Sequence, residues 1–170
     1  MIALEWMTAH EEQVTRVFEE SREDVYRYLV TLGLPAPQAQ EATQEAFLRL
    51  YLSLEKGMVI QNLRAWVFRV AHNHALDVAA KERFRPIEPE LEAVLHDKCR
   101  SVELELIERE KMDHLGKAWL KLSPQQRECL HLRAEGLRYR EIAETMQISI
   151  SSVREFLGRA IHRLQKAIYE

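Results

Sequence analysis

Apolar residues recur every three or four positions along most of the sequence, and this spacing predicts helices. The first half of the chain is expected to form three or four helices, with helical spacing over residues 14–32, a further helix over about 37–54 and another over 63–83. The first helix should end in residues 33–37, where glycine and proline interrupt it. Asn62 is expected to cap the third helix. The apolar faces predicted for the second and third helices are Ala39, Ala42, Ala46, Phe47, Leu50 and Leu54, and Trp66, Val67, Val70, Ala71, His74 and Val78.

The second half of the chain shows shorter helical segments with recognisable ends. Ser123 followed by Pro124 and Gln126 matches the start of a helix, with serine as the N-cap and glutamine as its capping-box partner. Gly136 suits the left-handed position that follows a helix. Ser149 is expected to cap the last helix. The expected helices cover residues 112–122, 124 to about 136, 139–146 and 150 to about 168.

The last two of these helices have the pattern of a helix-turn-helix. Two helices that cross steeply must bury small and apolar residues, and Ile142, Ala143 and Met146 meet that need on the first helix. Ile148 fills the turn. An ordinary helical hairpin is the alternative for the same spacing, but the caps, turn length and spacing together favour the helix-turn-helix. The apolar stripe continues on the second helix through Val153, Phe156, Leu157 and Ala160.

Charge is distributed unevenly along the sequence. The chain has a net charge of −3, which by itself argues against a nucleic-acid-binding protein. Counting Asp and Glu against Lys and Arg, however, gives −2 over residues 1–85, −5 over 86–113 and +4 over 114–170. A basic terminal domain is the pattern expected of a protein that binds phosphate backbones. Pro86 and Pro89 begin the acidic part, where the preceding helix must end.

These observations predict an all-α protein with two small helical domains joined by an acidic linker. The 46% of hydrophobic residues suffices for two small cores, and only five Gly and five Pro interrupt the helical pattern. We place the domains at residues 1–85 and 112–170 and the linker at 86–111. The C-terminal domain is expected to have four helices and to contain the helix-turn-helix.

The sequence gives little support to an enzyme, a membrane protein or a secreted protein. No apolar run approaches the length that crosses a bilayer, and the N-terminus lacks the pattern of a signal peptide. Cys99 and Cys129 are far apart in sequence, so we expect two reduced thiols of a cytoplasmic protein. His72 and His74 fall on roughly opposite sides of a helix, and no carboxylate pair or glycine-rich phosphate loop is present. We therefore expect no metal, cofactor or catalytic residue.

The exposed side of the last helix carries the residues expected to contact DNA. In a helix-turn-helix the N-terminal part of the second helix enters the major groove, where arginine binds guanine and glutamate accepts from cytosine. Arginines beside this surface are expected on phosphates, although each one taken singly is explained equally well as a solvated charge. The expected contacts are Ser151, Ser152, Arg154, Glu155 and Arg159, flanked by Arg138, Arg140 and Arg163.

Four segments of the sequence together resemble bacterial RNA polymerase sigma factors. LSPQQRE (residues 122–128) followed by GLRYREIAE (136–144) looks like sigma region 4, although it is also similar to the helix-turn-helix of response regulators. EATQEAFLRLY (41–51) resembles the region 2 helix that docks on RNA polymerase, and NLRAWVFRVAHNHALD (62–77) resembles the promoter-melting segment. The short linker points to the compact extracytoplasmic-function group.

The resemblance implies a mechanism and a set of partners. The N-terminal domain would bind the clamp helices of core RNA polymerase and capture the opened −10 strand, and the C-terminal domain would hold the −35 duplex near the polymerase flap. Residues 56–61 would correspond to the loop that pockets a flipped base. Trp66 and Phe68 are candidates for stacking on bases, although the helical spacing favours Trp66 as a core residue. An anti-sigma protein is a further expected partner. The implied polymerase-binding residues are Glu41, Gln44, Glu45, Phe47 and Arg49, and the implied −10 residues are Lys56, Arg64, Arg69, His72, Asn73 and Asp77.

Several positions depart from the family's usual residues. His72 stands where an arginine is common, and Gln147 stands where the turn usually has glycine. On the recognition helix Arg154-Glu155-Phe156 replaces the common Lys-Ser-Arg. The loss of one cation and the gain of a carboxylate should weaken phosphate binding and increase the discrimination between DNA sites.

Two alternative functions fit parts of the sequence. A stand-alone helix-turn-helix regulator, whose N-terminal half senses or dimerises, would bind a palindromic duplex without polymerase. A degenerate sigma-like module would bind a partner protein instead of DNA, and Glu155 together with the low net charge is compatible with it.

Overall fold

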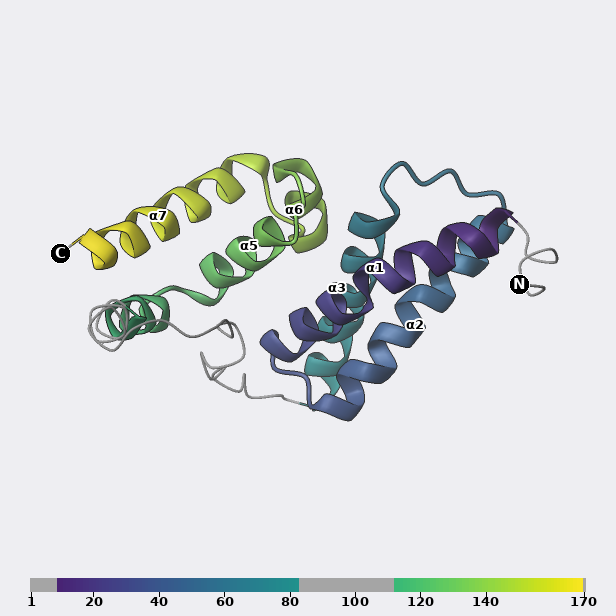
Figure 1. Ribbon diagram of the computed structural model, residues 1–170, viewed down its shortest axis with the longest axis horizontal. Helices are drawn as coiled ribbons and strands as arrows, with labels where there is room; N and C mark the ends of the chain where they lie inside the picture. Colours follow the sequence, from purple (N-terminus) through teal and green to yellow (C-terminus); the bar gives the residue numbers. More distant parts are fainter. Residues whose placement is uncertain (1–8, 83–111, 170) are drawn as a thin grey trace, which may run out of the picture. The chain divides into compact units, whose positions relative to one another are not determined.

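The computed structural model describes residues 9–82 and 112–169, and every regular element in these ranges is an α-helix. The chain divides into two compact units, which are described separately (Figure 1). The all-α prediction is therefore confirmed. The predicted linker, residues 86–111, lies outside the described residues, as does Cys99.

Three helices form the first unit: α1 (Ala9–Thr31), α2 (Ala36–Glu55) and α3 (Leu63–Glu82). α1 and α2 run alongside each other in opposite directions, and α3 packs on both (Figure 1). The chain leaves α1 through Gly33, whose φ of 99° is in the left-handed region. Asn62 caps α3 as predicted, because its Oδ1 accepts from the Ala65 N–H at 3.1 Å.

The core of the first unit is built from one apolar stripe on each helix. α1 contributes Val25, Tyr28 and Leu29, which are fully buried. The stripe predicted for α2 is confirmed, since all six of its members are buried. Burial of these side chains stabilises the bundle through the hydrophobic effect, by about 1.5–3 kcal/mol for each large apolar residue.

The buried face predicted for α3 was partly wrong. Val67 and Ala71 are buried as expected, but Trp66, Val70, His74 and Val78 are only half-buried. Apolar residues surround α3 on most sides, so their spacing alone does not distinguish the side that faces the core. The side chains that α3 buries besides the two expected ones are Ala65, Phe68, His72 and Ala75.

The second unit contains a helical segment over residues 112–120, followed by α5 (Pro124–Ala134), α6 (Tyr139–Met146) and α7 (Ile150–Tyr169). The capping box predicted at the start of α5 is present: Ser123 Oγ accepts from the Gln126 N–H at 3.3 Å, and Gln126 Oε1 accepts from the Ser123 N–H at 3.0 Å. Gly136 follows α5 with a φ of 85°, as its sequence position indicated. α5 packs against α7.

Candidate nucleic-acid interface

The turn between α6 and α7 is held by main-chain bonds and one serine. Gln147 is the C-cap that follows α6, and it adopts the left-handed conformation with φ 54° and ψ 42°. The Ile148 N–H then donates to the Ala143 carbonyl at 3.0 Å. Ser149 caps α7, because its Oγ accepts from the Ser152 N–H at 3.0 Å. These contacts confirm the predicted caps and fix where α7 begins.

Three serine hydroxyls lie together at the N-terminus of α7. Ser149 Oγ lies 2.8 Å from the hydroxyls of both Ser151 and Ser152. Ser151 is exposed and Ser152 is half-buried. A helix N-terminus carries a partial positive charge, and hydroxyls there can donate to an anion. The start of α7 is thus suited to a phosphate or a base edge.

The charged residues of α7 differ in their contacts with other residues of the chain. Arg154 is exposed at the surface. Glu155 and Arg159, one turn apart, form an ion pair on the same exposed face. Arg163 donates to the main-chain carbonyl of Lys121 and so joins α7 to the residues that follow the 112–120 helix. The predicted surface is therefore exposed, but Arg159 and Arg163 have partners within the chain.

The opposite side of α7 is apolar and holds the helix in place. Val153, Leu157 and Ala160 are buried, as expected, and Phe156 is half-buried. Arg138 and Arg140, near the start of α6, are exposed. Glu141 Oε2 accepts from the Arg138 N–H at 2.7 Å and thereby caps α6. The Arg138 side chain remains on the surface beside the start of α6.

The outward face of α2 carries most of the residues expected to bind polymerase. Glu41 and Gln44 are exposed, and Glu45 pairs with Arg49 at 2.7 Å. Phe47 lies elsewhere: it is 4% exposed and packs edge-on against Phe18, with ring centroids 5.0 Å apart. The expectation that Phe47 contacts a partner directly is therefore corrected, because its position in the helical repeat is on the core side.

Two apolar residues on that outward face were missed by the sequence analysis. Leu48 is 53% exposed and Leu52 is 44% exposed. At 100° per residue they fall on the same face as Glu41, Gln44 and Glu45. The signal was present in the sequence, since neither leucine falls in the apolar stripe of α2. Exposed leucines among polar residues are a common feature of protein-binding surfaces.

A hollow of about 340 Å³ opens between the end of α2 and α3. α3 contributes the side chains of Trp66, Val70 and Asn73 to its lining. The other lining side chains come from α2 and from Lys56, the residue that follows it. Lys56 and Asn73, both expected at the −10 element, meet here, together with Arg49 from the expected polymerase set. The lining residues are Arg49, Leu52, Ser53, Lys56, Trp66, Val70 and Asn73.

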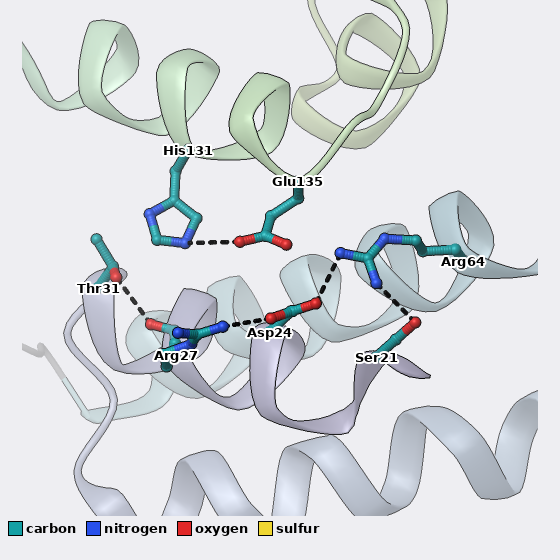
Figure 2. A network of polar contacts seen from close by, with 7 residues as sticks. All are labelled: Ser21, Asp24, Arg27, Thr31, Arg64, His131 and Glu135. Atoms are coloured by element: carbon teal, nitrogen blue, oxygen red, sulfur yellow. Dashed lines mark hydrogen bonds and ion pairs between the residues drawn. The ribbon is translucent and has the colours of Figure 1, made fainter. Parts of the chain in front are cut away.

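Arg64 does not share this hollow. Its guanidinium points to α1, where Nη1 donates to Ser21 Oγ at 2.7 Å and Nη2 donates to Asp24 Oδ2 at 2.9 Å (Figure 2). Asp24 also pairs with Arg27 one turn further along α1. The implied role of Arg64 at the −10 element is therefore corrected, because Arg64 lies on the α1 side of the helix, away from Asn73.

His72 is also directed inward. The imidazole is 3% exposed, and its Nδ1 lies 2.9 Å from the Tyr28 hydroxyl. Phe68 is fully buried beside Tyr28. The expectation of a DNA contact at His72, and of stacking at Phe68, is corrected because neither side chain reaches the surface. Arg69 and Asn73 are half-buried and Asp77 is exposed, so these three remain accessible.

Asp24 has a shifted pKa. Burial raises its pKa, but the hydrogen bonds and positive charges of Arg64 and Arg27 outweigh that effect, so the pKa lies below its ordinary value of 3.8. Asp24 therefore remains a carboxylate at neutral pH. The side chains of Arg64 and Asp24 are 30% and 23% exposed, so this ion pair is partly shielded from water.

The described residues contain no group of three or more His, Cys, Asp or Glu arranged to bind a metal ion. In the same ranges, no helix has the length and apolar character required to span a bilayer. Figure 2 also shows a contact within the second unit, at the end of α5. His131 Nε2 lies 3.9 Å from Glu135 Oε1.

Comparisons with known proteins match both halves of the chain. The family model for sigma-70 region 2 matches residues 17–85, and that for sigma-70 region 4 matches residues 115–164. The chain is 27% identical over 158 residues to the ECF RNA polymerase sigma factor SigM of Bacillus subtilis, which covers 92% of this chain and 94% of SigM.

Two solved structures have a fold similar to that of this chain. The sigma factor RpoE of Bartonella quintana, in co-crystal with the anti-sigma factor NepR, gives a TM-score of 0.60 at 19% identity, covering 92% of this chain and 97% of RpoE. CnrH, in complex with the cytosolic domain of CnrY, gives 0.57 at 23% identity, covering 91% of this chain and 86% of CnrH.

The two family models cover well over half of the chain, and the SigM match extends along nearly all of it. Proteins of this kind are transcription-initiation factors and not enzymes. The chain belongs to the sigma-70 family of RNA polymerase sigma factors, in the extracytoplasmic-function group, whose members direct the polymerase to promoters.

Proposed function

We propose that this sigma factor divides three tasks among three helices. α2 docks on the clamp helices of core RNA polymerase, α3 with the preceding loop captures the opened −10 strand, and α7 holds the −35 duplex. The proposal assigns the first two tasks to a domain at residues 1–85 and the third to a domain at 112–170, joined by the linker at 86–111. No cofactor takes part.

The hollow between α2 and α3 is the observation that carries the −10 assignment. Single-stranded nucleic acid is bound by aromatic side chains that stack on bases and by cations that follow the backbone. The hollow combines these features, with Trp66 inside it and Arg49 and Lys56 at its lining. Asn73 adds an amide that hydrogen-bonds a base edge. Arg69 and Asp77 lie on the same side of α3 and extend the surface.

The outward face of α2 supports polymerase docking. Leu48 and Leu52 give this face apolar area, and Glu41 and Gln44 give it polar specificity. Interfaces combine an apolar centre with polar surroundings in this manner. The Glu45–Arg49 pair presents one acidic and one basic group to a partner.

The start of α7 supports −35 recognition. The hydroxyls of Ser151 and Ser152 stand at the helix N-terminus, and Arg154 follows on the exposed side. Arg138 and Arg140 on the neighbouring helix supply phosphate contacts. Glu155 and Arg159 complete the surface, with Arg163 at its far end. We assign base contact to Arg154 and Arg159 in particular.

An anti-sigma protein is the proposed regulatory partner, and the cytoplasm is the proposed location, where polymerase works. RpoE and CnrH, which have the same fold, were each solved with a second protein bound, named as an anti-sigma factor for RpoE. By this proposal the bound anti-sigma protein holds the chain inactive until a signal releases it.

Transcription with core RNA polymerase and a library of randomised promoters tests the function. The wild-type chain should enrich templates that share a −35 and a −10 element. Asn73→Ala should reduce initiation at the −10 step and Arg154→Gln at −35 binding, while Arg16→Gln, on the exposed side of α1, serves as the control. Initiation from none of the templates would overturn the proposal, and binding to a palindromic duplex without polymerase would favour a stand-alone regulator.

A further inference from the structure

α3 makes two sets of contacts, which lie on opposite sides of the helix. Arg64, Phe68 and His72 are spaced four residues apart and fall on one side, toward α1. At 100° per residue, Trp66, Val70 and Asn73 fall on the other side, where they line the hollow. A rotation of α3 that moves one face therefore moves the other by the same angle.

The α1-facing side is held at two levels. At the first level, the Arg64 guanidinium binds Ser21 and Asp24 and lies over the Phe68 ring, 5.2 Å from its centroid (Figure 2). Ser21 is 1% exposed, so its hydroxyl is a buried partner in a fixed position. Hydrogen bonds to a planar guanidinium constrain its direction as well as its distance.

At the second level, two turns further along α3, His72 meets Tyr28. The two rings stack with their centroids 6.2 Å apart, and the 2.9 Å hydrogen bond joins Nδ1 to the hydroxyl. Both side chains are buried. A polar contact inside a core fixes a single arrangement, since displacing it leaves a buried polar group without its partner.

We propose that Ser21, Asp24 and Tyr28 of α1, acting through Arg64 and His72, set the rotation of α3 and so position Trp66 and Asn73 for the −10 strand. Arg64 and His72 are then positioning residues that do not touch DNA. A binding site that is displaced by about 1 Å loses much of its activity, so the supporting contacts matter as much as the contacting groups. This inference rests on the proposed function of the hollow.

The alternative is that Arg64 contacts DNA itself, and the two cases predict opposite effects at Asp24. If Arg64 bound a phosphate, neutralising Asp24 would release the guanidinium and leave or strengthen DNA binding. If Arg64 positions α3, losing either partner removes the same contact. Asp24→Asn should then weaken binding in the same direction as Arg64→Gln, which also loses the Ser21 bond, and the double variant should be no worse than Arg64→Gln alone.

The experiment measures binding of a labelled single-stranded −10 oligonucleotide to holoenzyme assembled from core polymerase and each full-length variant. The promoter is one selected by the wild-type holoenzyme. Arg64→Gln and the double variant should each weaken binding about tenfold, and Asp24→Asn should weaken it by a smaller factor. Discrimination between strands that differ in one −10 base should also fall, which a mere loss of folded protein would not cause. Affinity for core polymerase should remain that of the wild type.

Arg27→Gln is the matched control, because Arg27 pairs with Asp24 from within α1 and does not reach α3. It should bind the strand as the wild type does. If circular dichroism shows that either test variant is unfolded, Ser21→Ala takes its place, because it removes only one hydrogen bond. Ser21→Ala should also lose discrimination between −10 bases.

Three results would overturn the inference. One is an Asp24→Asn holoenzyme that binds the strand as tightly as the wild type. Another is an Arg64→Gln holoenzyme whose salt dependence falls by about one phosphate contact, which identifies a direct DNA contact. The third is a wild-type holoenzyme that binds no −10 strand. This result overturns the proposed function as well. The wild-type measurement alone therefore distinguishes a failure of the proposed function from a failure of this inference.

Discussion

The Tyr28 hydroxyl and the His72 Nδ1 lie 2.9 Å apart, although 44 residues separate them in sequence. Both side chains are buried, so the bond joins α1 to α3 inside the core of the first unit. A contact of this kind contributes to the stability of the unit as well as to the direction of α3.

Replacing Tyr28 by Phe keeps the ring and removes the hydroxyl. The loss of one hydrogen bond to a buried imidazole should lower the free energy of unfolding by about 1–2 kcal/mol. Urea unfolding measures this change. Tyr26→Phe is the control, since Tyr26 is only half-buried on the same helix and should unfold like the wild type. Equal stability of all three chains would show that the Tyr28 hydroxyl contributes nothing.

Acid should weaken the first unit through Asp24. Its pKa is lower in the folded chain than its ordinary value of 3.8, so the folded state binds this proton less readily than the unfolded state does. The stabilisation is complete above the unfolded pKa and is lost as the pH falls through the folded pKa, in the region below about pH 4. Asp24→Asn should be less stable at neutral pH, and the difference from the wild type should shrink in acid. A difference that is constant from neutral pH to acid would contradict this account.

Replacing Gln147 with glycine should raise the stability of the second unit. Its φ of 54° places a side chain in the left-handed region, where a non-glycine residue costs roughly 1–2 kcal/mol. Because glycine also loses more chain entropy on folding, Gln147→Gly should raise the stability of the second unit by only about 0.5–1 kcal/mol. Thermal unfolding measures the gain. Gln147→Ala keeps a Cβ and should show none, so a gain of equal size in that variant would rule out backbone strain as the cause.

Glu155 should limit the affinity of α7 for DNA. Its carboxylate pairs with Arg159 and lies on the face that we propose meets DNA. Glu155→Gln removes the repulsion and frees the arginine, so binding to a −35 duplex should strengthen and the slope of log K against log salt should steepen by about one contact. Arg138→Gln, at a proposed phosphate contact, should change both quantities in the opposite direction. Titrations at several salt concentrations distinguish these outcomes, and an unchanged slope in both variants would mean that the second unit does not bind the backbone.

Cys129 should resist modification in the folded chain. Burial, together with the charge of Glu128, raises the pKa of its thiol to about 11, so little thiolate forms at neutral pH. In a Cys99→Ser background, iodoacetamide should label Cys129 at about pH 8 only after denaturant is added. Fast labelling without denaturant would show that this part of the core opens readily. Mass spectrometry gives the extent of labelling.

Local signals made the ends of the helices predictable. Ser123 with Gln126, Gly136 and Ser149 each act on groups within four residues, so the sequence contains all that is required to place them. The stripe of α2 was predictable for a similar reason, because its other faces are mainly polar.

The direction of α3 was not predictable from the sequence. Its helix is apolar on most sides, and the groups that select the inward face, Asp24 and Tyr28, lie on another helix about 40 residues away. Arg64 and His72 therefore resembled surface residues in the sequence, although their partners direct them inward. The family resemblance indicated that this segment belongs to sigma region 2, which matches residues 17–85, but it carried no information on which face of α3 points inward.

Two residues of α2 belong to two surfaces. Arg49 and Leu52 line the hollow beside α3, and both also lie on or beside the outward face assigned to polymerase. A substitution at either position is expected to alter docking and strand capture together. Such positions evolve under a double constraint: a change that adapts the chain to a different promoter is retained only if the polymerase interface tolerates it. New promoter preferences should therefore arise first at Lys56, Trp66 and Asn73, to each of which we assign strand capture alone.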